Sequence, residues 1–266
     1  LGAETIKKKL PDITDFVRPY VKIEPIEEPI PVQPTAHYAM GGIPTDVYSR
    51  VLSDEKGTVL PGVYAAGEAA CVSVHGANRL GTNSLLDIVV FGKRAGQSMV
   101  DYVTQTKPNS ISDSASDDLS KKIQNLIDKE HTDEFSVANI RKDLQESMEE
   151  NAKIFRTKET LEKQTEILEE LRDRYENVTI FDKSKVHNSE LVEAIELDYL
   201  LDMSEATVAS ALARNESRGA HSRQDFPDRD DTNFMKHSFA FKKDNTANLK
   251  YKDVELGKYE PMERKY

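Results

Sequence analysis

One short loop combines residue types that bind a carboxylate. Residues 75–81 read His-Gly-Ala-Asn-Arg-Leu-Gly, so Arg79 lies in a loop with Gly76 before it and Gly81 after it. A guanidinium presents a planar fork that pairs with a carboxylate through two hydrogen bonds, and the flanking glycines leave room for a ligand. We therefore predict that Arg79 binds an anionic ligand. His75 could donate to the same ligand, but we interpret it as a residue that satisfies backbone groups.

Two more polar side chains come before this loop in the chain. Glu68 follows an apolar run at 59–66, where a carboxylate at the end of a strand can accept hydrogen bonds from ribose or ribityl hydroxyls. Such a glutamate can equally cap a helix. His37 precedes the glycine pair at 41–42 and is a candidate for a second carboxylate contact, although a structural histidine is the commoner case.

A helix start follows the loop. Ser84 is a natural N-cap, and Asp87 occupies the position of a capping box. The N-terminus of a helix offers unpaired amides and a partial positive charge, which can stabilise negative charge on a bound ring. The alternative is that the cap serves only to begin the helix.

The elements that must position these residues follow from composition. Prolines at 25, 29, 31 and 34 predict an extended connector. Residues 35–106 hold most of the glycines in the order loop, strand, glycine turn, loop and long helix. The helix at 84–103 is apolar on nearly every face, so we expect it to be buried, with Gly92 and Gly96 packed closely against a neighbour.

The second half of the chain has a different composition. A polar hinge at 107–117 precedes a stretch almost free of glycine and proline up to residue 214, whose apolar spacing predicts three or four amphipathic helices in a bundle. Residues 216–231 alternate in charge and predict an ion-pair lattice that joins domains. The tail at 215–266 is expected to be irregular structure packed on another domain.

Composition excludes several classes of protein. The chain has 266 residues and a formal net charge of -11, which argues against nucleic-acid binding. The single cysteine, Cys71, cannot form an internal disulfide and is typical of a reducing compartment. No stretch of about 18 apolar residues is present, so we expect no membrane span, and we expect no metal site.

Three segments resemble the flavoprotein subunits of the succinate dehydrogenase and fumarate reductase family. They read PTAHYAMGGIPT at 34–45, GEAACVSVHGANRLGTNSLLDIVVFGKRAG at 67–96, and NESRGAHSRQDFPDRDD at 215–231. The resemblance implies an α/β FAD-binding domain segment, the C-terminal half of a Rossmann-like domain, followed by an α-helical bundle and the tail. The expected domains are 1–28 (end of a capping domain and linker), 29–116 (FAD-binding), 117–214 (bundle) and 215–266.

The same resemblance assigns roles residue by residue. Glu68 corresponds to a ribityl contact, Ser84 and Leu85 to residues that reach the flavin ring, and His37 and Arg79 to ligands of succinate or fumarate. It also implies that an iron-sulfur subunit and membrane anchor subunits are the partners. The expected location is peripheral, on the cytoplasmic face of a bacterial inner membrane or the matrix face of the mitochondrial inner membrane.

Several family features have no counterpart in this sequence. The G-x-G-x-x-G fingerprint, the histidine that carries covalent flavin and the proton-shuttle arginine are expected upstream, so we assign no catalytic residue and expect the isolated chain to be inactive. The activity that the resemblance implies for the whole protein is oxidation of succinate to fumarate by hydride transfer to FAD. Fumarate reductase and L-aspartate oxidase are the enzyme alternatives. A non-catalytic fragment that binds a partner through its bundle is the alternative of a different class.

Overall fold

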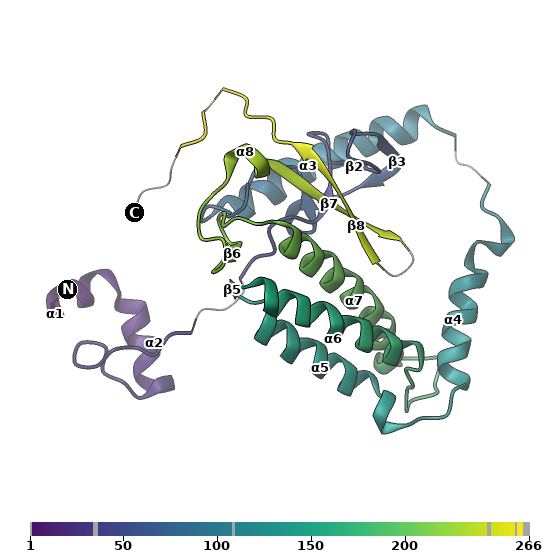
Figure 1. The fold of residues 1–266 in the computed structure, drawn as a ribbon, viewed down its shortest axis with the longest axis horizontal. Helices are drawn as coiled ribbons and strands as arrows, with labels where there is room; N and C mark the ends of the chain where they lie inside the picture. Colours follow the sequence, from purple (N-terminus) through teal and green to yellow (C-terminus); the bar gives the residue numbers. More distant parts are fainter. Residues whose placement is uncertain (1, 34–36, 108–109, 244–245, 259, 263–266) are drawn as a thin grey trace. The chain divides into compact units, whose positions relative to one another are not determined.

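The computed structural model describes residues 2–33, 37–107, 110–243, 246–258 and 260–262, and these form two units. The first, Leu1–Ala36, contains α1 (Ala3–Lys9) and α2 (Pro11–Val21), shown in purple in Figure 1. Pro11 opens α2 at a position where its missing amide donor costs nothing, and Lys22 ends it in the left-handed conformation. Residues 23–33 contain no helix or strand, as their prolines predict.

The second unit begins with short strands. β1 (Ile43–Pro44) pairs in parallel with β4 (Ala70–Cys71), and β2 (Arg50–Leu52) pairs antiparallel with β3 (Val59–Tyr64). The strand predicted at 59–66 is therefore present as β3. It leads through Gly67 into a 3-10 turn, η1 (Gly67–Ala69), which carries Glu68. Within the described ranges, each strand belongs to a two-stranded sheet.

The long helix α3 (Asn83–Gln105) is not buried as its sequence predicts. Only Asp87 and Ala95 are buried, while Leu85, Val89 and Val103 are each more than 60% exposed. A β-carbon added at Gly92 or Gly96 would meet no atom within 4 Å, so the expected close packing there is also wrong. The physical reason is that η1 and β3, the main elements packed against α3 in the described part of the chain, are short and cover only part of its surface.

A turn before β2 fixes the middle of α3. The hydroxyl of the fully buried Ser49 donates to the carbonyl of Phe91 at 2.9 Å, and Arg94 donates to the carbonyl of Val47 at 3.0 Å. Tyr64, at the end of β3, donates to the carbonyl of Ser98 at 3.2 Å. These bonds hold α3 against the hairpin without covering its apolar faces.

The predicted helical bundle is confirmed (Figure 1). It consists of α4 (Asp117–Asp128), α5 (Val137–Asn151), α6 (Lys158–Glu176) and α7 (Ser189–Ala213). Ser136, Thr157 and Asn188 cap the last three helices through their side chains. The main core lies between these helices and is built from the apolar residues that the helical spacing predicted, including Ile140, Leu144, Leu161, Leu168, Leu171 and Val208.

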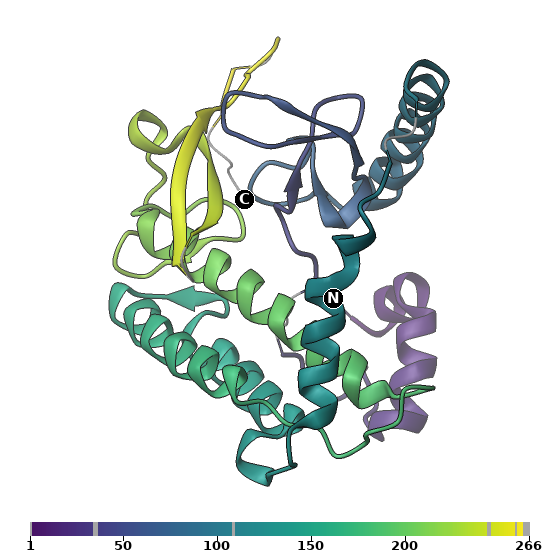
Figure 2. The same cartoon turned by 90° about the vertical axis from the view of Figure 1, so that its right-hand side faces the viewer.

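The tail contains more regular structure than predicted. β5 (Phe155–Arg156) pairs in parallel with β6 (Ser222–Arg223), and the short α8 (Asp231–Phe234) follows. β7 (Lys236–Lys243) and β8 (Thr246–Asp253) then form an antiparallel hairpin, drawn in yellow beside α7 in Figure 2. The available signal for β7 was the pair of aromatic residues two positions apart, Phe239 and Phe241, within a short run flanked by lysines.

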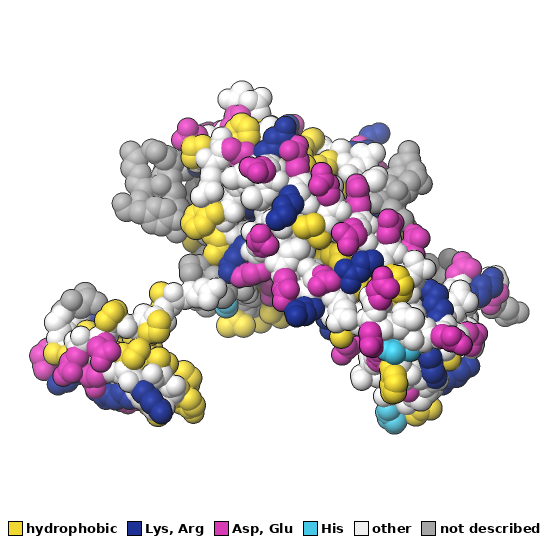
Figure 3. Space-filling model, turned by 60° about the horizontal axis from the view of Figure 1, so that its bottom comes forward, with side chains coloured by type: hydrophobic (Ala, Val, Ile, Leu, Met, Phe, Trp, Pro, Cys, Tyr) yellow, Lys and Arg dark blue, Asp and Glu magenta, His cyan; other side chains and the backbone are white. Residues whose placement is uncertain are grey.

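On the face shown in Figure 3, acidic and basic side chains are interspersed. Among the helices that the structure describes, none combines the length and apolarity needed to cross a lipid bilayer.

Candidate functional site

Four polar residues that were named from the sequence lie near the beginning of α3: Glu68, His75, Arg79 and Asp87. Gly42 lies at φ 117°, where a β-carbon would come 2.6 Å from the carbonyl oxygen of Ala69, so glycine lets the segment at 37–42 run beside η1. There the carboxylate of Glu68 accepts the amide of Ala39 at 3.0 Å. This bond places Tyr38 next to the loop that carries His75 and Arg79.

His75 bonds to side chains, so the interpretation that it satisfies backbone groups is wrong. Its Nε2 lies 2.9 Å from Oδ2 of Asp87, which is 4% exposed, and 3.4 Å from the hydroxyl of Tyr38. Since a carboxylate accepts, Nε2 carries the proton. Nδ1 is buried and has no hydrogen-bond partner among the described residues. The physical reason for the error is tertiary: Asp87, twelve positions later, turns back toward the loop.

The guanidinium of Arg79 is held by stacking. It lies 4.4 Å from the centroid of the Tyr38 ring and donates weakly to the carbonyl of Leu80 at 3.3 Å. Its Nε is buried without a partner in the described part of the chain. Most other arginines with described side chains pair with a carboxylate, whereas Arg79 pairs with none there. Its charge is therefore available to an anion.

Tyr38 supplies a neutral ring to this site. Burial raises the pKa of its phenol, and the nearby carboxylates of Asp87 and Glu68 raise that pKa further. The phenol consequently stays protonated at neutral pH, so it adds no negative charge beside Arg79.

The start of α3 differs from the capping pattern that the sequence predicts. The helix begins at Asn83 after Thr82, which lies in the left-handed conformation and makes no side-chain cap. Ser84 is thus inside the first turn, and the expected N-cap is wrong, because the turn at 80–83 runs directly into the helix and Asp87 is engaged by His75. Leu85 is 66% exposed, so it is free to contact a ligand.

His37 lies beside Tyr38 on the chain and is exposed. In the described residues it makes no hydrogen bond or ion pair. Its predicted role therefore stays a prediction, and Pro34, Thr35 and Ala36 of the same motif lie outside the described residues.

A segment far away in the sequence supports the Arg79 loop, and we call residues 214–231 the C-terminal strap. The amide of Ala220 donates to the carbonyl of Ala77 at 2.9 Å, and Gly219 lies against the same residue. After the strap, His237 on β7 bonds to the hydroxyl of Ser73 at 2.8 Å. The sequence did not predict either contact, because the residue patterns of the strap and of β7 do not show which distant segment each one contacts.

The ion pairs predicted in the strap are present, and the expectation that they join domains stays a prediction. Glu216 is fully buried between Arg214 and Arg218, at 2.7 and 2.8 Å. Arg223, also buried, pairs with Asp225 at 2.8 Å and donates to the carbonyls of Ala211 and Leu212 at the end of α7. A cation at the C-terminus of a helix stabilises its unpaired carbonyls.

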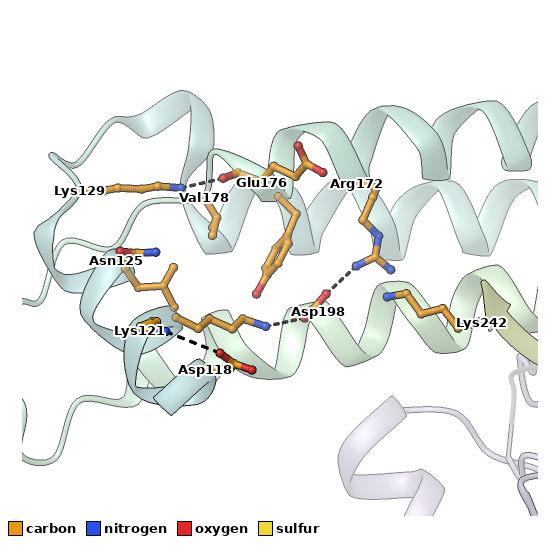
Figure 4. Close-up of a pocket in the computed structure, with 12 residues that line it drawn as sticks. Asp118, Lys121, Asn125, Lys129, Arg172, Glu176, Val178, Asp198 and Lys242 are labelled. Carbon is orange, nitrogen blue, oxygen red and sulfur yellow. Dashed lines mark hydrogen bonds and ion pairs between the residues drawn. The ribbon is translucent and has the colours of Figure 1, made fainter. Parts of the chain in front are cut away.

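A pocket of about 520 Å³ lies in the bundle, and Figure 4 shows the residues that line it. Its cations are already engaged: Lys122 and Arg172 contact Asp198 at 2.5 and 2.6 Å, and Lys129 donates to the carbonyl of Glu176 at 2.7 Å. Because these charges compensate one another, the pocket offers no free cation comparable to Arg79. We interpret it as a gap between helices. No cluster of metal-binding side chains occurs among the described residues.

Two family models of known proteins match separate segments of this chain. Residues 1–85 match the family model described as FAD binding domain, and residues 141–266 match that described as fumarate reductase flavoprotein C-term.

Individual relatives are succinate dehydrogenase and fumarate reductase flavoprotein subunits. The succinate dehydrogenase flavoprotein subunit of Rickettsia conorii is 45% identical over 245 residues, which are 90% of this chain and 41% of that protein. The fumarate reductase flavoprotein subunit of Serratia is 41% identical over 271 residues, covering 100% of this chain and 44% of that protein. The chain therefore spans less than half the length of these relatives.

A solved structure gives the same result. A variant of E. coli quinol fumarate reductase aligns with a TM-score of 0.85 and 38% identity, covering 99% of this chain and 44% of that one.

Proposed function

Because this chain belongs to the succinate dehydrogenase and fumarate reductase flavoprotein family, we propose that it is the C-terminal portion of a succinate dehydrogenase flavoprotein subunit. The protein would oxidise succinate to fumarate. The observation that carries the proposal is Arg79, a guanidinium without a carboxylate partner among the described residues, stacked on Tyr38 beside the start of α3. A dicarboxylate needs such a cation.

The cofactor of this family is FAD, and the residues at the start of α3 fit it. FAD supplies a ring that accepts two electrons as a hydride. Glu68 is exposed and uses one oxygen for Ala39, which leaves the other for a ribityl hydroxyl. Ser84 and Leu85 lie in the first turn of α3, where exposed apolar surface and helix amides are both suited to a flavin ring.

We assign binding roles, rather than proton transfer, to this chain's own residues. Arg79 would hold one carboxylate of the substrate through its planar fork, and His37 would donate to the other. The ring of Tyr38 keeps water from one face of the guanidinium and so strengthens that contact. Holding both carboxylates fixes the substrate carbons for the transfer.

The proposed partners are an iron-sulfur subunit and, through it, membrane anchor subunits that exchange electrons with quinone. We propose a peripheral location on the cytoplasmic or matrix face of the membrane. Support comes from the names of the relatives, which include a mitochondrial succinate dehydrogenase [ubiquinone] flavoprotein subunit of Oryza sativa, 42% identical over 96% of this chain.

Fumarate reduction is the second candidate function. The relatives named for it match the chain over its whole length at 39–41% identity, against 44–45% over 90% for the Rickettsia dehydrogenases. The binding chemistry of the two reactions is the same, since both ligands carry two carboxylates. The direction must therefore be measured.

The test uses the full gene product, purified with FAD and assayed with succinate, fumarate and L-aspartate. We expect succinate oxidation to be the fastest reaction. The variant Arg79→Gln should lose at least about a hundredfold in kcat/KM for succinate, because a charge-assisted bidentate contact is removed. Activity with L-aspartate alone, or an unchanged kcat/KM in Arg79→Gln, would overturn the proposal.

A further inference from the structure

A chain of contacts connects the interior of α3 to the guanidinium of Arg79. Asp87, 4% exposed, accepts from His75 at 2.9 Å. The imidazole then meets the ring of Tyr38 edge to face, with centroids 5.6 Å apart and planes at 84°. The same phenol ring carries the guanidinium of Arg79 at 4.4 Å from its centroid. Each contact in this series orients the next side chain.

We propose that Asp87 and His75 are positioning residues that hold Arg79 in its ligand-binding orientation through the ring of Tyr38. The inference rests on the proposed function, since it takes Arg79 as the carboxylate ligand. Arg79 needs such support because, among the described residues, it has no ion-pair partner and its one hydrogen bond is a long contact with its neighbour Leu80. A long flexible side chain without anchors would lose rotamer entropy on binding an anion.

The burial of Asp87 is best explained by this role. A buried carboxylate is costly unless it is paired, and Asp87 pairs with His75, itself only 12% exposed in its side chain. The pair therefore fixes the imidazole in one tautomer and one orientation. No side chain caps the start of α3, so capping does not account for the burial of Asp87.

The experiment measures binding of malonate, an unreactive dicarboxylate, to the FAD-loaded full gene product through the change in flavin absorbance. Replacing the ring in Tyr38→Leu should raise the Kd for malonate about tenfold, because the stacking surface is lost. Tyr38→Phe keeps that surface and should change the Kd by less than about twofold. His75→Gln should behave like Tyr38→Leu and raise KM for succinate more than it changes kcat, which a purely structural defect would not do.

The matched control is His131→Gln. His131 forms a similar histidine-aspartate pair with Asp133, Nε2 to Oδ1 at 3.2 Å, but in the bundle. This variant should leave the Kd for malonate unchanged. If His75→Gln fails to fold, the comparison of Tyr38→Leu with Tyr38→Phe decides, since both retain the His75–Asp87 pair.

A double-mutant cycle separates this inference from the proposed function. In an Arg79→Gln background, His75→Gln should cause no further loss of malonate binding, because the residue acts through Arg79. If His75→Gln and Tyr38→Leu bind malonate normally while Arg79→Gln does not, the positioning role is wrong and the proposed function stands. If Arg79→Gln itself binds malonate normally, Arg79 is not the carboxylate ligand, and both the proposed function and the positioning role are wrong.

Discussion

Gly219 lies against Ala77 so closely that a β-carbon on the glycine would be 2.5 Å from the alanine carbonyl. Its φ of +60° is in the left-handed region that disfavours other residues. The neighbouring amide of Ala220 bonds to the same carbonyl. The C-terminal strap thus supports the loop that carries Arg79 from two residues away, through backbone rather than side-chain contact.

We predict that Gly219→Ala destabilises the full gene product by more than its conformational cost. The left-handed conformation alone costs about 1–2 kcal/mol for alanine, and the backbone collision adds about 1–3 kcal/mol. Gly257→Ala is the control, because Gly257 has a similar φ of +64° with no atom near its β-carbon position. Urea unfolding measures both variants, and equal losses would show that the strap does not press on the loop.

Lowering the pH should weaken the strap through His221. Its Nε2 donates to the carbonyl of Arg214 at 3.1 Å, so its Nδ1 accepts from Arg156 at 3.1 Å. Burial lowers the pKa of His221 from 6.5, and the charges of Arg156, Arg223 and Arg214 lower it further. The unfolded state then binds a proton more readily than the folded state, so this stability is present above the ordinary pKa and falls below it.

The measurement is the urea midpoint at about pH 7.5 and about pH 5. The unaltered protein should lose more stability over this interval than His221→Gln, which cannot titrate. His187→Gln, at an exposed histidine, should keep the full pH dependence. An identical pH dependence in His221→Gln and the unaltered protein would contradict the prediction.

The bundle depends on a second buried cation. Arg172 on α6, 8% exposed in its side chain, contacts Asp198, Asp202 and Glu205 on α7 at 2.5–2.8 Å. Replacing it in Arg172→Met leaves three neighbouring carboxylates with fewer partners and should cost about 3 kcal/mol. Arg174→Met removes the more exposed pair with Asp143 on the same helix and should cost less than about 1 kcal/mol. Thermal unfolding compares them, and a smaller effect at Arg172 would refute the assignment.

The isolated chain should bind FAD weakly and should not oxidise succinate. The residues assigned to the flavin are confined to η1 and the first turn of α3, while Leu85 and Val89 stay exposed to solvent. We expect a purified 266-residue chain to be colourless after gel filtration with FAD, and we expect the full gene product to be yellow. A yellow, succinate-oxidising preparation of the isolated chain would disprove this.

The sequence predicted the local features of the molecule well. Helical spacing identified the bundle, because Ile140, Leu144 and Leu161 face one core that each helix completes with its neighbours. The ion-pair lattice of the strap was predictable from its alternating charge. The residues at 37, 68 and 79 were singled out by their types and their glycine neighbours.

The predictions that were wrong concern contacts between different segments of the chain. Ser84 looked like a cap, but a capping rule cannot show that Asp87 turns to His75 instead of the backbone. The apolar pattern of α3 predicted burial, yet a pattern gives no information on which partner covers a face. The alternating residues of β7 were overlooked beside the dense charge of the preceding strap.

The bond between Ser73 and His237 joins positions 164 residues apart, and the bundle lies between them in the chain. Closing so long a loop costs entropy that is repaid only after the intervening helices have packed. During folding, the bundle should therefore form first and the loop of Arg79 should be fixed last. Kinetically, acquisition of the ligand-competent geometry would follow the appearance of helical structure as a separate, slower phase.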